Sequence, residues 1–314
     1  MKSPLIALAS FALVSCAPTF TPGEREPIAV INDKELKSTF EKEMGKLYEA
    51  GGTTPHATLV KQLSRKSCKL DLPAPGKRIL SPSEVYRQGL DTTVLLGKLN
   101  RCRSKQCRKT HASIASGVII HEDGVVLTNY HVVDSKAPRL LGMGAMTHDG
   151  KAFLVEEVLA ADKKSDFAIL KLKGASGLSA APIYRDEPVG NPAIIISHPT
   201  GKFFTLSQGA VSRYHVRGDG TCVMNVTADY AKGSSGGPIF NHRGDLIGLV
   251  ASTVSIPYRH APLAVDEQSK ALKLASPSTK AAKVGGKPLT IGISHQMTLK
   301  NTVPSRAILE VIEE

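Results

Sequence analysis

The amino-acid sequence predicts an all-β fold of two antiparallel β-barrels, preceded by a helical extension and followed by a C-terminal helix. The 314 residues contain 27 Gly and 19 Pro, which separate short runs of Val, Ile and Leu, a pattern typical of β-rich proteins with many turns. A hydrophobic content of 41% is enough for a packed core. From about residue 85, apolar residues alternate instead of recurring at helical spacing, which indicates where the first barrel begins.

The N-terminal residues are predicted to be a targeting segment and not part of the fold. Lys2 precedes an apolar run over residues 5–14, which has the length of a signal-peptide core and is too short to span a membrane. The run ends in Leu-Val-Ser-Cys at positions 13–16, which resembles the lipobox of bacterial lipoproteins.

The resemblance to lipoproteins implies that residues 1–15 are a signal peptide and that a lipidated Cys16 anchors the chain in a membrane. Residues 16–32, which are rich in Thr, Pro and charge, would then be a tether. An ordinary signal peptide, with Ser15 and Ala17 at the cleavage positions, is the alternative. We therefore expect an exported protein that is lipid-anchored in the bacterial cell envelope, either periplasmic or associated with the outer membrane.

Residues 33–84 are predicted to form the helical extension. Apolar residues at positions 36, 40, 44 and 47 follow helical spacing between a cap at Asn32 or Asp33 and the pair Gly51-Gly52, so a helix is expected there. Its apolar stripe should pack on the body of the protein. A second, short helix is predicted over 58–66, and Ser-Pro-Ser-Glu at 81–84 has the form of a capping box that opens a third.

Alternating apolar residues predict five strands in each barrel. The first barrel, within residues 85–175, is predicted to contain strands at 92–99, 111–121, 124–129, 153–160 and 167–172. The second unit, residues 176–314, is predicted to contain strands at 193–197, 204–213, 222–227, 238–241 and 245–252. The tail 304–314 is predicted to be a helix, because Ile308, Val311 and Ile312 lie on one helical face.

The chain is basic, with 40 Lys and Arg against 28 Asp and Glu and a formal charge of +12. Such a charge could attract anionic lipid, a cell-wall polymer or nucleic acid. The charges are scattered, however, which is typical of a solvated surface. The densest cluster, at 101–109, lacks the interleaved aromatic residues that base stacking requires, so no specific nucleic-acid partner is expected.

The strongest indication of chemistry is Lys-Gly-Ser-Ser-Gly-Gly-Pro at positions 232–238. A nucleophilic hydroxyl must be exposed and must lie near free backbone N–H groups, and flanking glycines permit both. Alone, the segment could be a simple turn. Two further positions support a catalytic interpretation, because His131 directly follows one apolar strand and Asp166 directly precedes another. The order His, Asp, Ser suits a triad assembled across two barrels.

These three motifs together resemble the trypsin-like serine peptidases, including the bacterial HtrA-type and glutamyl-endopeptidase-type enzymes. The resemblance covers about residues 85–260 and implies six strands in each barrel. It is strengthened by Ile-Ser-His-Pro-Thr-Gly at 196–201 and Leu-Ser-Gln-Gly-Ala-Val-Ser at 206–212, a strand–loop–strand pattern of the second barrel in those bacterial enzymes. It implies a serine-type endopeptidase that acts on proteins or peptides and needs neither a cofactor nor a metal.

The resemblance also implies a role for each site residue. Ser235 would be the nucleophile, His131 the general base and Asp166 the group that orients the imidazole. The backbone N–H groups of Gly233 and Ser235 would form the oxyanion hole. Because the base must be neutral, activity should fall at acid pH. The alternative is a catalytically inactive trypsin-like binding lipoprotein of the cell envelope. Other histidines are expected at the surface or in loops: His111, His121 and His198.

The residues expected to line the substrate pocket leave the specificity open. Asp229 lies six residues before the nucleophile, where the trypsin branch has an acidic pocket floor, which implies selection of Lys or Arg. Ala251, Ser252 and Thr253 would line the facing wall. The β-branched Thr253 stands where the open trypsin pocket has glycine, and it would favour small aliphatic residues. Asp229 could instead be a hydrogen-bond acceptor at a strand end.

Four cysteines remain after Cys16 is set aside, an even number in an exported protein, where disulfides persist. Cys102 and Cys107 enclose a predicted hairpin turn in which their Cβ atoms can face each other, so a bridge is expected. Cys68 and Cys222 would form the second pair or remain free thiols. The spacing and the scarcity of further ligands argue against zinc.

Overall fold

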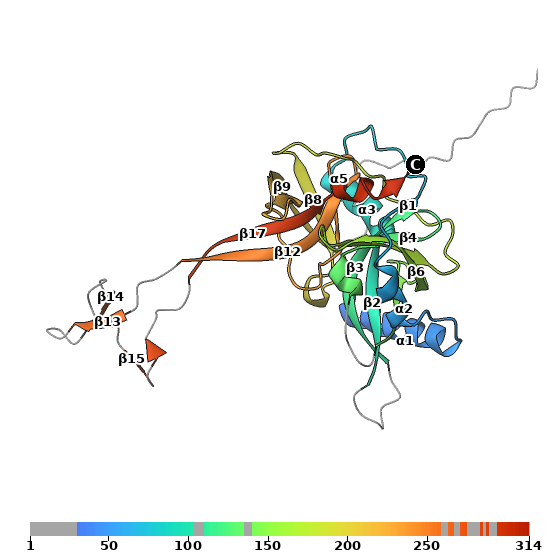
Figure 1. The fold of residues 1–314 in the computed structure, drawn as a ribbon, viewed down its shortest axis with the longest axis horizontal. Coiled ribbons are helices and arrows are strands. Elements are labelled where there is room, and N and C mark those ends of the chain that lie inside the picture. Colours follow the sequence, from blue (N-terminus) through green and yellow to red (C-terminus); the bar gives the residue numbers. More distant parts are fainter. Residues whose placement is uncertain are drawn as a thin grey trace, which may run out of the picture. The chain divides into compact units, whose positions relative to one another are not determined.

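The structure is a computed structural model that describes residues 30–102, 110–134, 140–258, 263–266, 271–274, 283–284, 287–288 and 294–313. Its centre is a pair of closed antiparallel barrels, each with six strands (Figure 1). The predicted all-β fold is therefore confirmed. No helix in these ranges is long and apolar enough to cross a membrane.

The first barrel closes in the order β2-β3-β4-β7-β6-β5. Its strands are β2 (Thr93–Arg101), β3 (Thr110–His121), β4 (Val125–Thr128), β5 (Leu140–Met146), β6 (Ala152–Asp162) and β7 (Phe167–Leu172). The strand β5 is the one that the sequence pattern did not predict.

The second barrel closes in the order β10-β17-β12-β11-β8-β9. Its strands are β8 (Pro192–Ser197), β9 (Thr205–Val216), β10 (Cys222–Val226), β11 (Pro238–Phe240), β12 (Leu246–Tyr258) and β17 (Ser294–Pro304). The strand β17 was not predicted. Paired β12 and β17 continue beyond the barrel as a two-stranded ribbon (Figure 1). Two small sheets, β13 (Leu263–Asp266) with β14 (Ala271–Leu274) and β15 (Lys283–Val284) with β16 (Lys287–Pro288), lie between them in the sequence.

Alternating side chains of β2 enter two different hydrophobic clusters, as the period of two predicts. Leu95 packs in the cluster that contains Phe40, and Val94 and Leu96 pack in the cluster that contains Leu59. All of these side chains are almost fully buried, and each burial of this kind stabilises the fold by roughly 1.5–3 kcal/mol. Both faces of the strand are thus covered, which explains why the strand reads as a nearly continuous apolar run.

The predicted N-terminal helices are present. Helix α1 (Asp33–Glu49) begins at Asn32, whose side chain accepts a hydrogen bond from the Glu35 N–H. It buries Met44 against Gly144 of β5, where a Cβ atom would collide with the methionine sulfur. Helix α2 (His56–Gln62) is shifted towards the N-terminus from the predicted 58–66. Helix α3 (Pro82–Thr92) has the predicted capping box.

The C-terminal helix is shorter than predicted. Helix α5 (Ser305–Leu309) ends before the last residues, and β18 (Ile312–Glu313) pairs in parallel with β1 (Cys68–Lys69). The prediction that Ile312 continues the helix is therefore wrong. The physical reason is a competing partner, because the Cys68 N–H donates to the Val311 carbonyl and the Leu70 N–H donates to the Glu313 carbonyl.

The predicted bridge between Cys68 and Cys222 is not formed. Both residues are free thiols, one on β1 beside the C-terminal strand and the other at the start of β10 in the second barrel. Each therefore belongs to a different sheet with its own pairing partner, and burial raises the pKa of the Cys68 thiol to about 11. Cys107 and Cys16 lie outside the described residues, and so do the bridge to Cys102 and the lipidation that the sequence predicts.

Candidate active site

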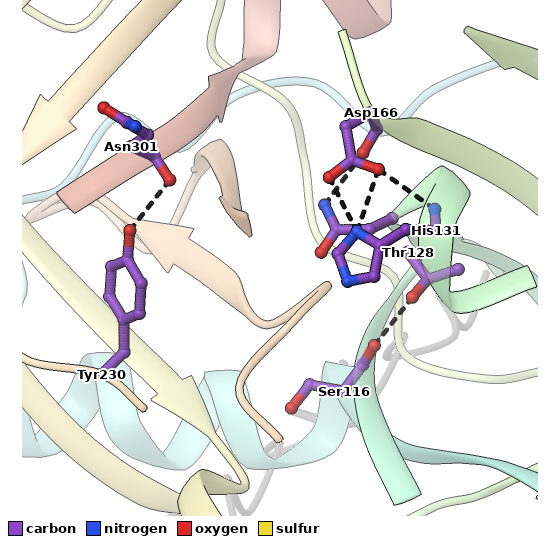
Figure 2. Close-up of polar contacts among 7 residues, drawn as sticks. Ser116, Thr128, His131, Asp166, Tyr230 and Asn301 are labelled. Carbon is purple, nitrogen blue, oxygen red and sulfur yellow. Dashed lines mark hydrogen bonds and ion pairs between the residues drawn. The ribbon is translucent and has the colours of Figure 1, made fainter. Parts of the chain in front are cut away.

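The first barrel brings His131 and Asp166 together. His131 lies on α4 (Tyr130–Val133), the short helix that follows β4, and its Nδ1 is 2.8 Å from Oδ2 and 3.0 Å from Oδ1 of Asp166 (Figure 2). The backbone N–H of His131 also donates to Oδ1, at 3.0 Å. Since a carboxylate can only accept, Nδ1 carries the proton of the neutral ring and Nε2 has the lone pair. The imidazole is thus held in the tautomer that can act as a base.

Asp166 has an unusual backbone conformation, with φ of +63° in the turn before β7. Aspartate tolerates this left-handed region better than most residues. The Asn129 side-chain amide donates to the Asp166 carbonyl at 2.9 Å and holds the turn in place. Strained backbone of this kind often occurs at functional sites.

Ser235 lies in the loop between β10 and β11, where two glycines are required. Gly233 has φ of +100° and packs against the His198 carbonyl, and Gly236 has φ of +77° and packs against Ser116 and Thr128. A side chain at either position would be strained and would collide with neighbouring backbone or side chains.

The loop leaves two backbone N–H groups available. The Ser234 N–H donates to Ala231, the Gly236 N–H to Val250 and the Gly237 N–H to Ser234. Within the described parts of the chain, the N–H groups of Gly233 and Ser235 donate no hydrogen bond. This is the arrangement that an oxyanion hole needs, because its donors must be free to meet a developing negative charge.

Ser116 of β3 connects the first barrel to this loop, a role that the sequence did not indicate. Its N–H donates to the Ser235 carbonyl at 2.9 Å, and its hydroxyl donates to the Gly233 carbonyl at 3.2 Å. Its own carbonyl accepts from the Thr128 hydroxyl at 2.9 Å (Figure 2). Nothing in the sequence distinguishes Ser116 from other strand serines, since its partners are more than a hundred residues away in two of the three bonds.

His198 lies in the loop between β8 and η1, as one of the two predicted alternatives has it, but it is buried and not at the surface. Only 1% of the residue is exposed. Its Nε2–H donates to the Val94 carbonyl and its Nδ1 accepts from the Phe204 N–H, both at 3.1 Å. Burial lowers the pKa of His198 to about 4, so the ring is neutral at physiological pH. Of the other two histidines, His111 is exposed and His121 is half-buried.

We expect His198 to make the fold sensitive to acid. The unfolded chain takes up a proton at this histidine below about pH 6.5, whereas the folded chain does so only near pH 4. Stability is therefore complete above pH 6.5 and should fall by up to about 3 kcal/mol as the pH drops to 4. Urea unfolding at several pH values measures this. His198→Gln should show a shallower dependence than the wild type, and identical slopes would contradict the prediction.

The N-terminal extension contacts both halves of the site. The His56 Nε2 lies 2.8 Å from the carbonyl of Val133, on the helix that carries His131. Asp33 Oδ1 accepts from the Phe203 N–H at 2.9 Å, and its Oδ2 lies 3.3 Å from the Lys202 ammonium. The loop that contains these partners includes the 3-10 helix η1 (Pro199–Gly201) and is bonded to the nucleophile loop through the Thr200 N–H and the Lys232 carbonyl, at 2.6 Å.

The residues predicted to form the pocket are only partly brought together. Ala251 and Ser252 line a cleft with His131 and Asp166, whereas the Asp229 side chain is 91% exposed and forms an ion pair with Lys300 of β17. Thr253 is exposed and pairs with Lys300 across the β12–β17 ladder.

Tyr230 follows Asp229 in the sequence and contacts the β12–β17 ladder. Its hydroxyl is 2.8 Å from the carbonyls of both Ser252 and Asn301 (Figure 2 shows the contact with Asn301). Sequence analysis did not indicate Lys300, because Lys300 belongs to the unpredicted strand β17. It did not indicate Tyr230 either, because its partner Asn301 lies on the same strand.

Two clefts flank the His131 side chain. The first, of about 370 Å³, is lined by His131, Asp166 and Ser252. The second, of about 490 Å³, is lined by His131, Gly233 and Ser235. The candidate base and nucleophile therefore face the same cavity. Among the described residues, no group of three His, Cys, Asp or Glu side chains is arranged to hold a metal ion.

Comparison with known families identifies the segment that contains these residues. Residues 115–249 match the family model of the trypsin-like peptidase domain. His131, Asp166 and Ser235 all lie within this trypsin-like peptidase segment. The structure is also similar to that of the "HtrA-type protease AlgWS227A with tripeptide", with a TM-score of 0.50 and 18% identity over 74% of this chain and 62% of that chain. That similarity supports the two-barrel fold.

Several curated proteases are similar to part of this chain. Serine protease HTRA1 of Xenopus tropicalis is 30% identical over 151 residues, which are 45% of this chain and 32% of the relative. A probable periplasmic serine endoprotease DegP-like of Halomonas elongata is 34% identical over 142 residues, 44% of this chain and 29% of the relative. Serine endoprotease DegS of Haemophilus influenzae is 30% identical over 151 residues, 46% and 42% of the two chains. This chain thus spans less than half the length of each relative.

Proposed function

We propose that this protein is a serine endopeptidase that hydrolyses peptide bonds of protein or peptide substrates through His131, Asp166 and Ser235. The observation that supports it most is the bidentate contact between Asp166 and His131 Nδ1. His131 also lines a cleft with Gly233 and Ser235, whose backbone N–H groups donate no hydrogen bond to any described residue. The similarity of residues 115–249 to the trypsin-like peptidase domain, and of part of the chain to HtrA- and Deg-type proteases, agrees with it.

The mechanism is acyl transfer in two halves. Ser235 Oγ forms a bond to the scissile carbonyl carbon while His131 Nε2 takes its proton, and the N–H groups of Gly233 and Ser235 stabilise the oxyanion. The intermediate expels the amine, which receives the proton from His131, and leaves an acyl-enzyme. Water then attacks with the same proton transfers, and the acid product leaves. Asp166 stabilises the imidazolium in both halves.

A fluorophosphonate probe tests the proposal, because the reagent needs an activated serine. We expect the protein to be labelled at Ser235 and to hydrolyse casein or a peptide library. A protein that is folded but neither labelled nor active would contradict the proposal and would favour the inactive binding lipoprotein.

We further propose that the chain is exported and anchored through a lipidated Cys16. The apolar run followed by Leu-Val-Ser-Cys supports this, and the periplasmic location in the name of the DegP-like relative agrees with it. The proposal is tested with a fatty-acid probe in cells that express the wild type or Cys16→Ala. We expect only the wild type to be labelled, and equal labelling of both would rule the anchor out.

The ion pair between Asp229 and Lys300 favours small residues over Lys or Arg immediately before the scissile bond. A basic substrate side chain would have to compete with Lys300, whose side chain is only 11% exposed, for the Asp229 carboxylate. Cleavage of a peptide library should therefore show no enrichment of Lys or Arg at this position. Strong enrichment that disappears in Asp229→Ser would show that the carboxylate binds the substrate.

We expect Asp33→Ala to lower kcat about tenfold with little change in KM. The variant loses the bond to the Phe203 N–H, a charge-assisted hydrogen bond of the kind worth about 1.5–3 kcal/mol, and this should loosen the loop that packs against Gly233. Steady-state hydrolysis measures the effect. Asp33→Asn is the matched control, because it keeps the acceptor oxygen and loses only the charge. Equal loss in both variants would mean that the hydrogen bond does not position the loop.

A further inference from the structure

Both clefts that flank His131 are lined by cationic side chains. The first cleft contains Lys163, Lys164 and Arg217, and the second contains Lys37, Lys98 and Lys232. They come from different elements of the fold, including α1, β2 and the loops that carry Asp166 and Ser235. The clefts concentrate a positive charge that appears scattered in the sequence.

These six cations have no carboxylate partner at contact distance among the described residues. None of them forms an ion pair within 4.0 Å of a carboxylate in the described ranges, whereas Lys202 and Lys300 do. Asp134 and Asp166 are the carboxylates that line the first cleft, and Asp166 already binds His131. Asp219 lies close enough to Lys164 and Arg217 for their charges to help lower its pKa. The second cleft has no acidic lining residue among those described.

Lys98 is the clearest case of an uncompensated charge. It is half-buried on β2, and burial lowers the pKa of its ammonium to about 8. The negative charge of Asp134 acts in the opposite direction and raises this pKa, but its effect is smaller. A cation held in this way gains from the arrival of a carboxylate, which restores the interactions that were lost with water. The environment of Lys98 is therefore suited to an anionic group of a ligand.

We propose that the substrate is an acidic peptide segment, with Asp or Glu on both sides of the scissile bond, held by the two basic clefts. This inference rests on the proposed peptidase function, and it concerns which peptides the site takes. A chain that runs through both clefts must pass His131, which lines each of them, and Ser235, which lines the second. Its side chains on either side of the reacting carbonyl would then meet Lys163 and Lys164 in one direction and Lys98 and Lys232 in the other.

The test uses three peptides that share the residues next to the scissile bond and differ only further out, where they carry Asp and Glu, the neutral Asn and Gln, or Lys. Binding is measured by fluorescence anisotropy with full-length Ser235→Ala, and kcat/KM is measured with the wild type. We expect the acidic peptide to bind at least ten times more tightly than the amide peptide, and the Lys peptide to bind most weakly. A salt concentration of about 1 M, where the Debye length is about 3 Å, should remove most of the difference.

Charge reversal identifies the side chains responsible. Lys163→Glu combined with Lys164→Glu, and separately Lys232→Glu, should each reduce the acidic-to-amide ratio about tenfold and improve binding of the Lys peptide. Lys66→Glu is the matched control, because Lys66 is exposed and lines neither cleft, so its ratio should equal that of the wild type.

The outcomes separate this inference from the proposed function. Equal affinity for all three peptides, or a preference that survives both charge reversals, overturns the inference even if the wild type cleaves them. A preference for the acidic peptide in Ser235→Ala that the reversals abolish supports the inference, whether or not the wild type turns the peptide over. Failure of the wild type to cleave a peptide that it binds would instead count against the proposed function.

Discussion

Ser235→Ala is expected to lower kcat/KM for peptide hydrolysis by about a million-fold, with the fold intact. The substitution removes the only atom that forms the acyl bond. It leaves the backbone contact between the Ser235 carbonyl and the Ser116 N–H, which holds the loop. The residual rate should still exceed that of the uncatalysed reaction, because binding and the two N–H donors remain. Kinetics at high enzyme concentration, with circular dichroism as the test of folding, provide the measurement.

Ser234→Ala is the matched control for this experiment. The Ser234 side chain is buried and bonded to the Ser197 hydroxyl at 3.0 Å, away from the cleft. Its loss should cost about 1–2 kcal/mol of stability and reduce activity by less than about tenfold. If Ser234→Ala were as inactive as Ser235→Ala while folded, the identity of the nucleophile would have to be reconsidered.

The strands that could be predicted are those whose own side chains fill the core. β7 and β8 are nearly continuous apolar runs, and every residue of β7 except Lys171 is buried. Such runs are informative because burial depends on the residue itself. The missed strand β5 is different, since Gly142 and Gly144 interrupt its pattern to make room for Thr53 and Met44 of the extension. The residues that explain the glycines lie almost a hundred positions away.

The strand β17 was missed because three of its five residues described as buried are polar. Lys300, Asn301 and Thr302 are each less than 10% exposed. Their partners come from distant segments: Asn225 donates to Asn301, and the Thr302 hydroxyl donates to the Met224 carbonyl. From the sequence alone such a polar run is expected at the surface, because burying polar groups costs free energy unless they are hydrogen-bonded. The sequence pattern does not show the distant partners that make these bonds.

The candidate site divides in the same way. His131, Asp166 and Ser235 could be identified because each stands beside an apolar strand or within a glycine loop, and because their order fits a known arrangement. Ser116 and His198 could not, because they act through backbone hydrogen bonds between segments far apart in sequence. A reaction that needs particular side chains produces a recognisable sequence motif. Hydrogen bonds to backbone carbonyl and N–H groups, which position the site, do not produce one, because every residue has these groups.

Asp166→Asn is expected to lower kcat/KM by about ten-thousand-fold and to change stability by less than about 1 kcal/mol. Asparagine tolerates the left-handed φ of +63°, and the Asn129 bond to the backbone carbonyl does not depend on the side chain. Its amide group, however, can donate to Nδ1 of His131, which would move the ring proton to Nε2 and leave no lone pair for Ser235.

The matched control is Asp162→Asn, on the same turn, where Asp162 accepts from the Ser165 hydroxyl and the Lys164 N–H and does not contact His131. We expect this variant to keep at least a third of the wild-type kcat/KM, as measured with the same peptide and matched melting temperatures. A fully folded Asp166→Asn that retained more than a tenth of the wild-type activity would show that the carboxylate does not set the tautomer. The 2.8 Å contact would then be a structural link between α4 and the β6–β7 turn.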